Sequence, residues 1–206
     1  HFTRLSKGFE DGYLGRNGKA KCCMMDLRGT EAPSTASESE ALARFDDNIA
    51  VLSSMLSGYA AEHLGFLIHS RTPLLMRKNF SGPEDEAKHP LTIASNKEAG
   101  AFLSVMERRR ICVLQLMGPA AGVATLSAVA TSADGDSSDD EDEEEGLERR
   151  QDIKLHMKPG DIVVFLCGEY DFEFSSKGDY LMLQAWFLDS PSEFVMEGTV
   201  SGNLEA

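Results

Sequence analysis

The side chains that could bind a catalytic metal are few in this chain. A common site for reactive iron uses two histidines and one carboxylate on one face of the metal. The chain has five histidines, His1, His63, His69, His89 and His156. The residues two positions after them are Thr3, Gly65, Arg71, Leu91 and Lys158, so there is no His-x-Asp or His-x-Glu pair. A metal site would need other ligands, and Asp171, His156 and His89 are the candidates that would have to converge.

The four cysteines indicate neither a disulfide framework nor a nucleophile. Cys22 and Cys23 are adjacent, whereas Cys112 and Cys167 stand alone inside apolar runs, where they are typical of small core residues. This usage favours a reducing compartment. Two lysines flank the adjacent pair and can activate a thiol, but no histidine stands nearby to act as its base. We therefore expect no catalytic cysteine.

The charge of the chain is concentrated in one tract. The formal net charge is −14, and residues 132–148 hold ten carboxylates and no base, so the remainder is only mildly acidic. Such a tract repels itself and cannot bury enough apolar surface to fold, which predicts a solvated insertion. The only dense basic cluster is Arg108, Arg109 and Arg110. This is too small for a nucleic-acid footprint, so we expect no nucleic-acid partner.

Residues 41–64 carry the clearest helical pattern. Apolar residues recur three and four positions apart in one stripe, formed by Leu42, Phe45, Ile49, Leu52, Leu56 and Tyr59. Ser37 or Ser39 is the expected cap at its start. The length and charge suit a helix packed on a sheet, and no apolar run in the chain approaches the length of a membrane span.

After Gly65 the sequence changes to short apolar runs separated by turn residues. The runs are FLIHS, PLLMRK, LTIAS, RRRICVLQLMG, VATLSAVA, DIKLHMK, DIVVFLCG, YDFEF and DYLMLQAWFLD. Strands at this spacing predict an α+β fold whose sheets form a jelly-roll-like sandwich or barrel with supporting helices. The expected organisation is an irregular docking segment and linker over 1–40, a barrel over 41–189, and a tail over 190–206.

Three stretches of the barrel region resemble one enzyme family. The segments LGFLIHSRTPLLMRKN, ERRRICVLQLMGPAAGVATLS and HMKPGDIVVFLCGEYDFEFSSKGDYLMLQAWFLD, taken in order, are similar to the prolyl-4-hydroxylase type of 2-oxoglutarate/Fe(II) dioxygenases. The resemblance covers roughly residues 41–189. It implies a double-stranded β-helix with an N-terminal supporting helix.

The chemistry of that family needs residues that this chain lacks. Its iron is held by a His-x-Asp or His-x-Glu pair and a distal histidine, and a later base, usually arginine, pairs with the cosubstrate. No histidine follows His156, so Tyr170 and Asp171 occupy the region of the distal ligand. No arginine follows Arg150, and Lys177 is the only base in the closing hairpin. We therefore expect a barrel without an iron centre, with no catalytic, cofactor or metal residues, and with Tyr170, Phe172 and Phe174 in its core.

The segment FEDGYLG, Phe9 to Gly15, has a resemblance of its own. It is similar to the ExGYLG element upstream of dinoflagellate ketosynthases, matched by Glu10, Gly12, Tyr13, Leu14 and Gly15. The simpler interpretation is a turn in which the glycines permit positive φ while Tyr13 and Leu14 pack on the body. If the segment is a docking arm instead, these residues and Phe9 bind the partner.

Together these features favour a non-catalytic accessory subunit that docks on other protein subunits of a larger assembly. The dinoflagellate resemblance suggests a plastid, with a peripheral photosystem subunit as one concrete form and a cytoplasmic location as the alternative. The chain begins with His1, so a targeting leader is an open expectation. Any membrane association would be peripheral, through a partner. The alternatives are a divergent oxygenase, a partner domain of polyketide synthesis, or a small-molecule binding module with an apolar cavity at the barrel mouth.

Overall fold

The computed structural model describes residues 1–25, 36–129 and 152–191, and within 36–41 only the backbone. The predicted acidic insertion at 132–148, residues 26–35 of the predicted linker and residues 192–206 of the predicted tail lie outside the described residues. No helix in the described ranges is both long enough and apolar enough to cross a membrane.

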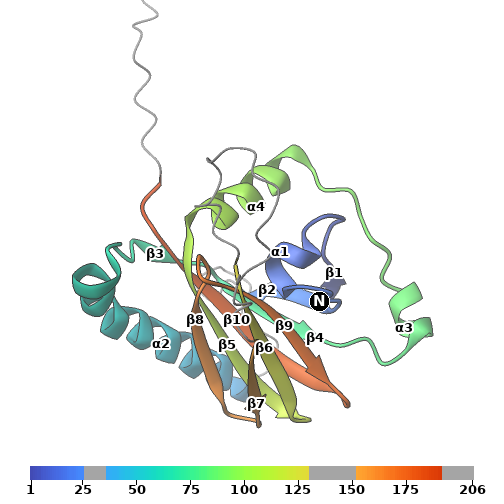
Figure 1. Ribbon diagram of the computed structural model, residues 1–206. Helices are drawn as coiled ribbons and strands as arrows, with labels where there is room; N and C mark the ends of the chain where they lie inside the picture. Colours follow the sequence, from blue (N-terminus) through green and yellow to red (C-terminus); the bar gives the residue numbers. More distant parts are fainter. Residues whose placement is uncertain (26–35, 130–151, 192–206) are drawn as a thin grey trace, which may run out of the picture.

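Two antiparallel sheets face each other, and the α+β class expected from the sequence is observed (Figure 1). The larger sheet has the strand order β1-β2-β4-β10-β5-β8, with β3 also paired to β10. Its strands are β1 (Thr3–Arg4), β2 (Lys21–Met25), β3 (Ser70–Arg71), β4 (Leu74–Lys78), β5 (Arg109–Pro119), β8 (Ile162–Leu166) and β10 (Tyr180–Leu188). The smaller sheet has the order β7-β6-β9, made of β6 (Gly122–Ala128), β7 (Ile153–Met157) and β9 (Tyr170–Ser176).

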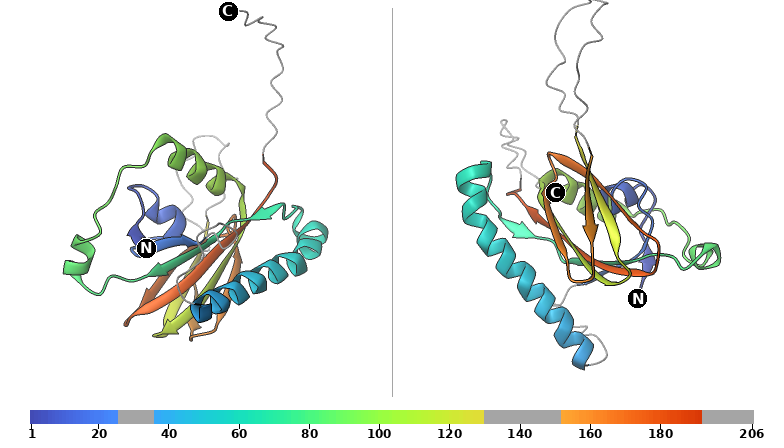
Figure 2. Two further views of the ribbon diagram at one scale, coloured as in Figure 1. Left: turned by 180° about the vertical axis from the view of Figure 1, so that it is seen from behind. Right: turned by 60° about the horizontal axis from the view of Figure 1, so that its bottom comes forward.

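The helices lie on the outer face of the larger sheet and toward one end of the two sheets. Helix α2 (Ala36–Tyr59), continued by a π-helical turn η1 (Ala60–Leu64), runs along the outer face of the larger sheet, on the side away from the smaller sheet (Figure 2). The short α1 (Glu10–Leu14) and the longer α4 (Asn96–Arg108) lie toward one end of the two sheets, while α3 (Pro83–Ala87) stands in the long connection from β4 to α4.

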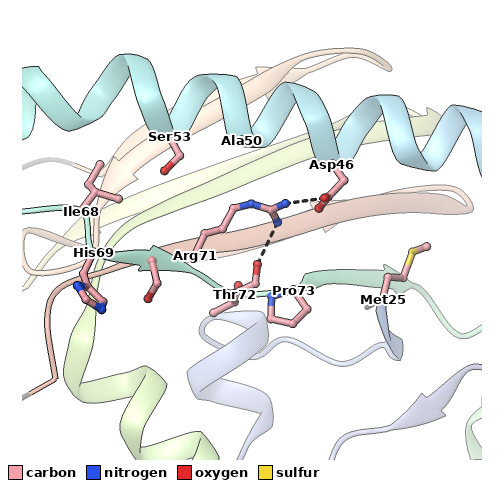
Figure 3. A pocket seen from close by; sticks show the side chains of 10 residues that line it. Met25, Asp46, Ala50, Ser53, Ile68, His69, Arg71, Thr72 and Pro73 are labelled. Atoms are coloured by element: carbon pink, nitrogen blue, oxygen red, sulfur yellow. Dashed lines mark hydrogen bonds and ion pairs between the residues drawn. The ribbon is translucent and has the colours of Figure 1, made fainter. Parts of the chain in front are cut away.

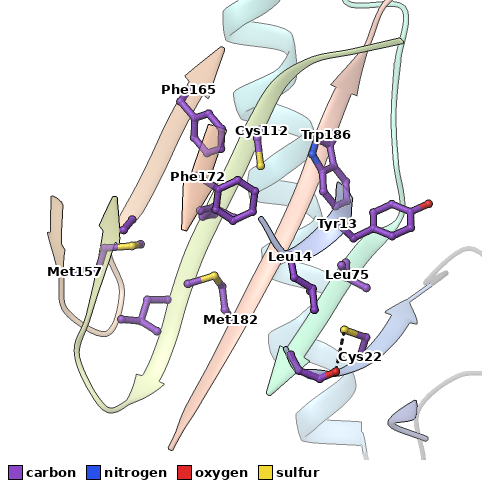
Figure 4. Packing of buried hydrophobic residues seen from close by; sticks show 14 of the residues in the cluster. Tyr13, Leu14, Cys22, Leu75, Cys112, Met157, Phe165, Phe172, Met182 and Trp186 are labelled. Atoms are coloured by element: carbon purple, nitrogen blue, oxygen red, sulfur yellow. Dashed lines mark hydrogen bonds between the residues drawn. The ribbon is translucent and has the colours of Figure 1, made fainter. Parts of the chain in front are cut away.

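The main core lies between the two sheets (Figure 4). It includes Leu75, Cys112, Met157, Phe165, Phe172, Met182 and Trp186. Strands β5 and β10 are buried along almost their whole length because sheet and helix cover their two faces. This double coverage explains why their sequences are nearly continuous apolar runs rather than alternating ones. The aromatic side chains of β9 behave as predicted: Phe172 is buried, and Tyr170 and Phe174 pack against the same cluster.

The predicted long helix is confirmed, with different ends. Ile49 is buried, and Phe45, Leu52 and Leu56 pack beside it on the sheet residues of a second core cluster. Tyr59, expected in the same stripe, is 55% exposed and does not belong to this cluster. The helix already begins at Ala36, so the prediction that Ser37 or Ser39 caps it is wrong. It ends at Gly65, whose left-handed φ of 72° is readily adopted by glycine.

Three segments differ from the sequence predictions. Residues 1–25, expected to be irregular, contribute β1, α1 and β2, and both strands join the larger sheet. LTIAS, expected to be a strand, has no regular structure, and α4 follows it where no helix was predicted. Only the last residue of FLIHS, Ser70, enters a strand, the two-residue β3.

Candidate functional site

The end of α1 is held inside the fold by three side chains from three strands. Three successive carbonyl groups near the end of α1 have no partner within the helix. Arg109 on β5 donates to the Gly12 carbonyl at 2.7 Å. Gln184 on β10 donates to the Tyr13 carbonyl at 2.8 Å, and Arg77 on β4 donates to the Leu14 carbonyl at 3.0 Å. The N-terminal segment is therefore an integral part of the core.

The two glycines of the FEDGYLG segment are required by this packing. A Cβ atom on Gly12 would lie 2.6 Å from the ring of Phe102 on α4. Gly15 has a φ of +80°, and a Cβ atom there would lie 2.2 Å from the carbonyl oxygen of Phe172. That same oxygen accepts a hydrogen bond from the backbone N–H of Arg16 at 2.8 Å. The segment therefore approaches β9 so closely that only glycine fits at position 15.

The other residues of the segment also have intramolecular roles. The ring of Phe9 stacks on Phe102 with centroids 4.3 Å apart. Tyr13 and Leu14 are buried, and Tyr13 contacts both Phe102 and Trp186. Glu10 pairs with Arg4 at 2.8 Å. These contacts agree with the expected packing of Tyr13 and Leu14 on the body of the protein. The expected turn is wrong in part, because Gly12 lies inside the helix α1 and, of the two glycines, only Gly15 has a positive φ. Binding of a partner by these residues stays a prediction.

A cavity of about 330 Å³ remains at the mouth between the sheets, beside the N-terminal segment. We call it the mouth cavity. Its lining is Asp11, Gly15, Arg16, Asn17, Arg109, Cys112, Phe165, Cys167, Tyr170, Asp171, Phe172 and Trp186. The lining combines acidic and basic side chains with aromatic rings. Arg109 is already engaged by the Gly12 carbonyl, and Arg16 donates to the hydroxyl of Ser127.

The thiols beside this cavity are poor nucleophiles. Burial raises the pKa of Cys167 to about 12, with a small opposing influence of Arg109. Burial likewise raises the pKa of Cys112 well above its usual value and that of Cys22 to about 12. A thiol with such a pKa is almost entirely protonated at neutral pH and cannot act as a thiolate.

We predict the order in which the four cysteines react with iodoacetamide at pH 8. Cys23, the only one of the four that is neither deeply buried nor beside the mouth cavity, reacts first, while Cys22, Cys112 and Cys167 stay unmodified in the folded protein. Peptide mass spectrometry after brief labelling measures this, with labelling in urea as the control in which all four react. Early modification of Cys167, which is only half-buried, would contradict the raised pKa of its thiol.

The side chains that a metal site would need do not come together. Asp171 lines the mouth cavity, His156 is exposed on β7, and His89 follows α3, where its Nδ1 lies 2.9 Å from the carbonyl oxygen of Asp85. Lys177 is exposed in the turn between β9 and β10. Within the described ranges, no group of three histidine, cysteine or acidic side chains is placed to hold a metal ion.

A second hollow lies between α2 and β3 (Figure 3). Its volume is about 500 Å³, and the Arg71 guanidinium crosses it to pair with Asp46 on α2 at 2.6 Å. Arg71 also donates to the Thr72 carbonyl. This pair ties the helix to the sheet, and the charges that could attract a ligand are already satisfied by each other.

Comparison with known proteins adds no relative. A scan against protein-family models finds no family that matches the chain, and a search of curated proteins finds no significant match.

Proposed function

We propose that this protein is a non-catalytic accessory subunit, built on a double-stranded β-helix barrel, that docks on a larger protein assembly through the outer face of α2. The observation that carries the proposal is that α2 has two apolar faces, of which the sheet covers only one.

The strand pairing supports a barrel of this kind. An eight-stranded jelly roll is a long hairpin wrapped into a barrel, so that strand one pairs with eight, two with seven, three with six and four with five. If β4 is the first strand and β5 the third, three of these pairs are present as β4–β10, β5–β8 and β6–β7. The second strand is replaced by α3 and α4, and the N-terminal segment takes its place beside β9.

The same replacement supports a non-catalytic role. The sequence lacks the paired and distal histidines and the late arginine that the resembling dioxygenases need. The protein packs its own residues Tyr13 and Leu14 between the sheets. The thiols that line the mouth cavity beside them are protonated at neutral pH. Of the charged groups there, Arg109 is already bound to the Gly12 carbonyl. A substrate entering here would have to displace part of the core.

The outer face of α2 supports docking. Val51, Met55 and Tyr59 are four residues apart, so they lie above one another on one side of the helix. Their side chains are 57%, 72% and 55% exposed. Three large apolar side chains in line on a helix surface form the pattern by which helices recognise each other. The occupant that fits this stripe is an apolar helix of a partner subunit.

Gly58 gives this face a second distinguishing feature. A glycine inside a helix costs about 1 kcal/mol relative to alanine. No atom lies within 4 Å of the place where its Cβ would stand, so packing within this chain does not require a glycine. Beside Met55 and Tyr59, it leaves a notch in which the backbone of a second helix can approach closely.

The experiment is to replace Val51, Met55 and Tyr59 together by Ser, Gln and Gln in the full chain and to measure assembly in the native cell. We expect the stability to stay unchanged and the affinity for the assembly to fall by at least about 100-fold, because each buried interface anchor contributes on the order of 1 kcal/mol or more. Native size fractionation and affinity purification report the loss.

The matched control replaces Leu91, Ile93 and Leu103, which are also large, apolar and exposed but lie away from α2. This variant should assemble normally. If the control disrupts assembly as much as the α2 variant, or if the α2 variant assembles like the wild type, the proposed docking face is wrong.

A peripheral subunit of a plastid photosystem complex is the specific form of this proposal. It rests on the resemblance of the FEDGYLG segment to dinoflagellate sequences. The identity of the proteins that co-purify with the wild type, and are lost from the α2 variant, decides between this complex and any other.

A further inference from the structure

The most buried basic side chain of the described chain has no acidic partner. Arg77 on β4 is only 2% exposed. Its Nη1 donates to the Leu14 carbonyl, its Nε lies 3.2 Å from the sulfur of Met182, and its guanidinium stands 5.6 Å from the ring centres of Phe172 and Phe174. No hydrogen bond from Nη2 is formed to the described residues. Burial lowers the pKa of the Arg77 guanidinium. The titratable groups whose charges also act on this pKa are Tyr180, Cys22 and Cys112, and none of these is a carboxylate.

Several more accessible basic residues have acids at ion-pair distance: Arg4 with Glu10, Lys21 with Asp85, Arg71 with Asp46, and Arg110 with Asp189. Arg16 and Arg109 bind neutral oxygens, as Arg77 does, but neither is as deeply buried as Arg77. A buried charge without a counter-charge is strongly unfavourable. The carbonyl of Leu14 and the two aromatic faces offset part of this cost, but they supply no negative charge.

A hollow of about 210 Å³ lies directly beside Arg77. The residues that line it with Arg77 are Leu14, Asn17, Gly18, Lys19, Ala20, Phe174, Ser175, Ser176 and Tyr180. None of them is acidic. The hydroxyl of Tyr180 forms no hydrogen bond to a described residue, and burial raises the pKa of that phenol, so it remains a donor at neutral pH. The hollow thus combines a buried guanidinium, a phenol and, at its rim, the exposed ammonium of Lys19, which lies 3.6 Å from the Glu86 carboxylate and would turn from it to reach a bound anion.

We propose that this hollow is a binding site for a small oxyanion, the carboxylate or phosphate group of a soluble metabolite, with Arg77 as its fixed counter-charge. Nη2 of Arg77 and the Tyr180 hydroxyl supply hydrogen bonds, and Lys19 closes the rim. Oxyanions are the ligands that arginine binds most strongly. The volume accepts one such group with a few further atoms. This inference does not depend on docking through α2, since the hollow lies on the other side of the larger sheet.

The test is calorimetric titration of the full chain in a chloride buffer with inorganic phosphate and, in a separate series, with acetate. We expect at least one of them to bind with a dissociation constant near or below about 1 mM and to raise the melting temperature of the protein. The two series distinguish a phosphate site from a carboxylate site.

Two variants locate the binding without removing a core residue. Tyr180→Phe deletes only the hydroxyl and should weaken binding by roughly 10-fold or more, the loss expected for a hydrogen bond to a charged group. Lys19→Met should weaken it several-fold, whereas Lys97→Met, an equally conservative change on α4, should leave it unchanged. Arg77→Met, where it folds, should show no anion-dependent rise in melting temperature.

Two outcomes would overturn the proposal. One is that neither anion binds to the folded wild type at concentrations up to about 10 mM, which would nearly saturate a millimolar site. The other is that Tyr180→Phe and Lys19→Met bind as tightly as the wild type, which would show that the anion binds elsewhere.

Discussion

Replacing Gly15 by alanine is expected to lower the free energy of unfolding by about 3 kcal/mol or more. The left-handed φ of +80° at this position costs a residue with a Cβ about 1–2 kcal/mol. The new methyl group would also stand 2.2 Å from the Phe172 carbonyl oxygen, which accepts the N–H of Arg16 and belongs to β9, a strand held in place by its pairing with β6. The N-terminal segment must then move away from β9, and the contacts of Tyr13 and Leu14 weaken with it. Urea unfolding measures the change.

Gly8→Ala is the matched control for that experiment. Gly8 immediately precedes the FEDGYLG segment and has a similar φ of +89°, but nothing stands within 4 Å of its would-be Cβ. Only the backbone cost applies, so the loss should be about 1–2 kcal/mol. Equal losses in the two variants would contradict the close contact between the segment and β9.

Replacing Tyr13 by alanine should cost about 3–5 kcal/mol, the range for removing a buried aromatic side chain. Tyr13 is 8% exposed and lies between Phe102 and Trp186, with ring centres 5.2 Å from each. Its loss leaves a cavity exactly where α1, α4 and the larger sheet meet. Because Trp186 is the only tryptophan and is fully buried beside this ring, its fluorescence reports the change together with the shift in urea midpoint.

The tyrosine on the outer face of α2 serves as the comparison. Tyr59→Ala removes the same side chain from a position that is 55% exposed, and the stability should change by no more than about 0.5 kcal/mol. The same variant should weaken assembly. If Tyr13→Ala were as mild as Tyr59→Ala, the N-terminal segment would be a detachable arm, as its glycine-rich sequence first suggested.

Most strands after Gly65 could be predicted because they carry a local signal. The long runs of β5 and β10, the turns at Pro159-Gly160 and Lys177-Gly178, and the stripe of α2 are all visible within a few residues. Helix α4 has a local signal as well. Ser95 and Glu98 form a capping box, and Phe102, Val105 and Met106 follow at helical spacing.

The role of the N-terminal segment could not be predicted in the same way. Its carbonyl groups meet Arg77, Arg109 and Gln184, which are far away in the sequence, and no local pattern specifies such partners. Arg77 illustrates the limit most clearly. An arginine near the end of PLLMRK is expected at the surface, and only the three-dimensional arrangement puts it between the sheets beside a hollow.

The proposal that this protein docks as a subunit and has no metal centre is tested most directly by native mass spectrometry of the protein purified from its own cells, combined with metal analysis. The account predicts one stable complex that contains partner subunits, is lost in the Val51, Met55 and Tyr59 variant, and holds no iron at the barrel mouth. A free monomer carrying stoichiometric iron that is lost on replacing Asp171 or His156 would contradict it.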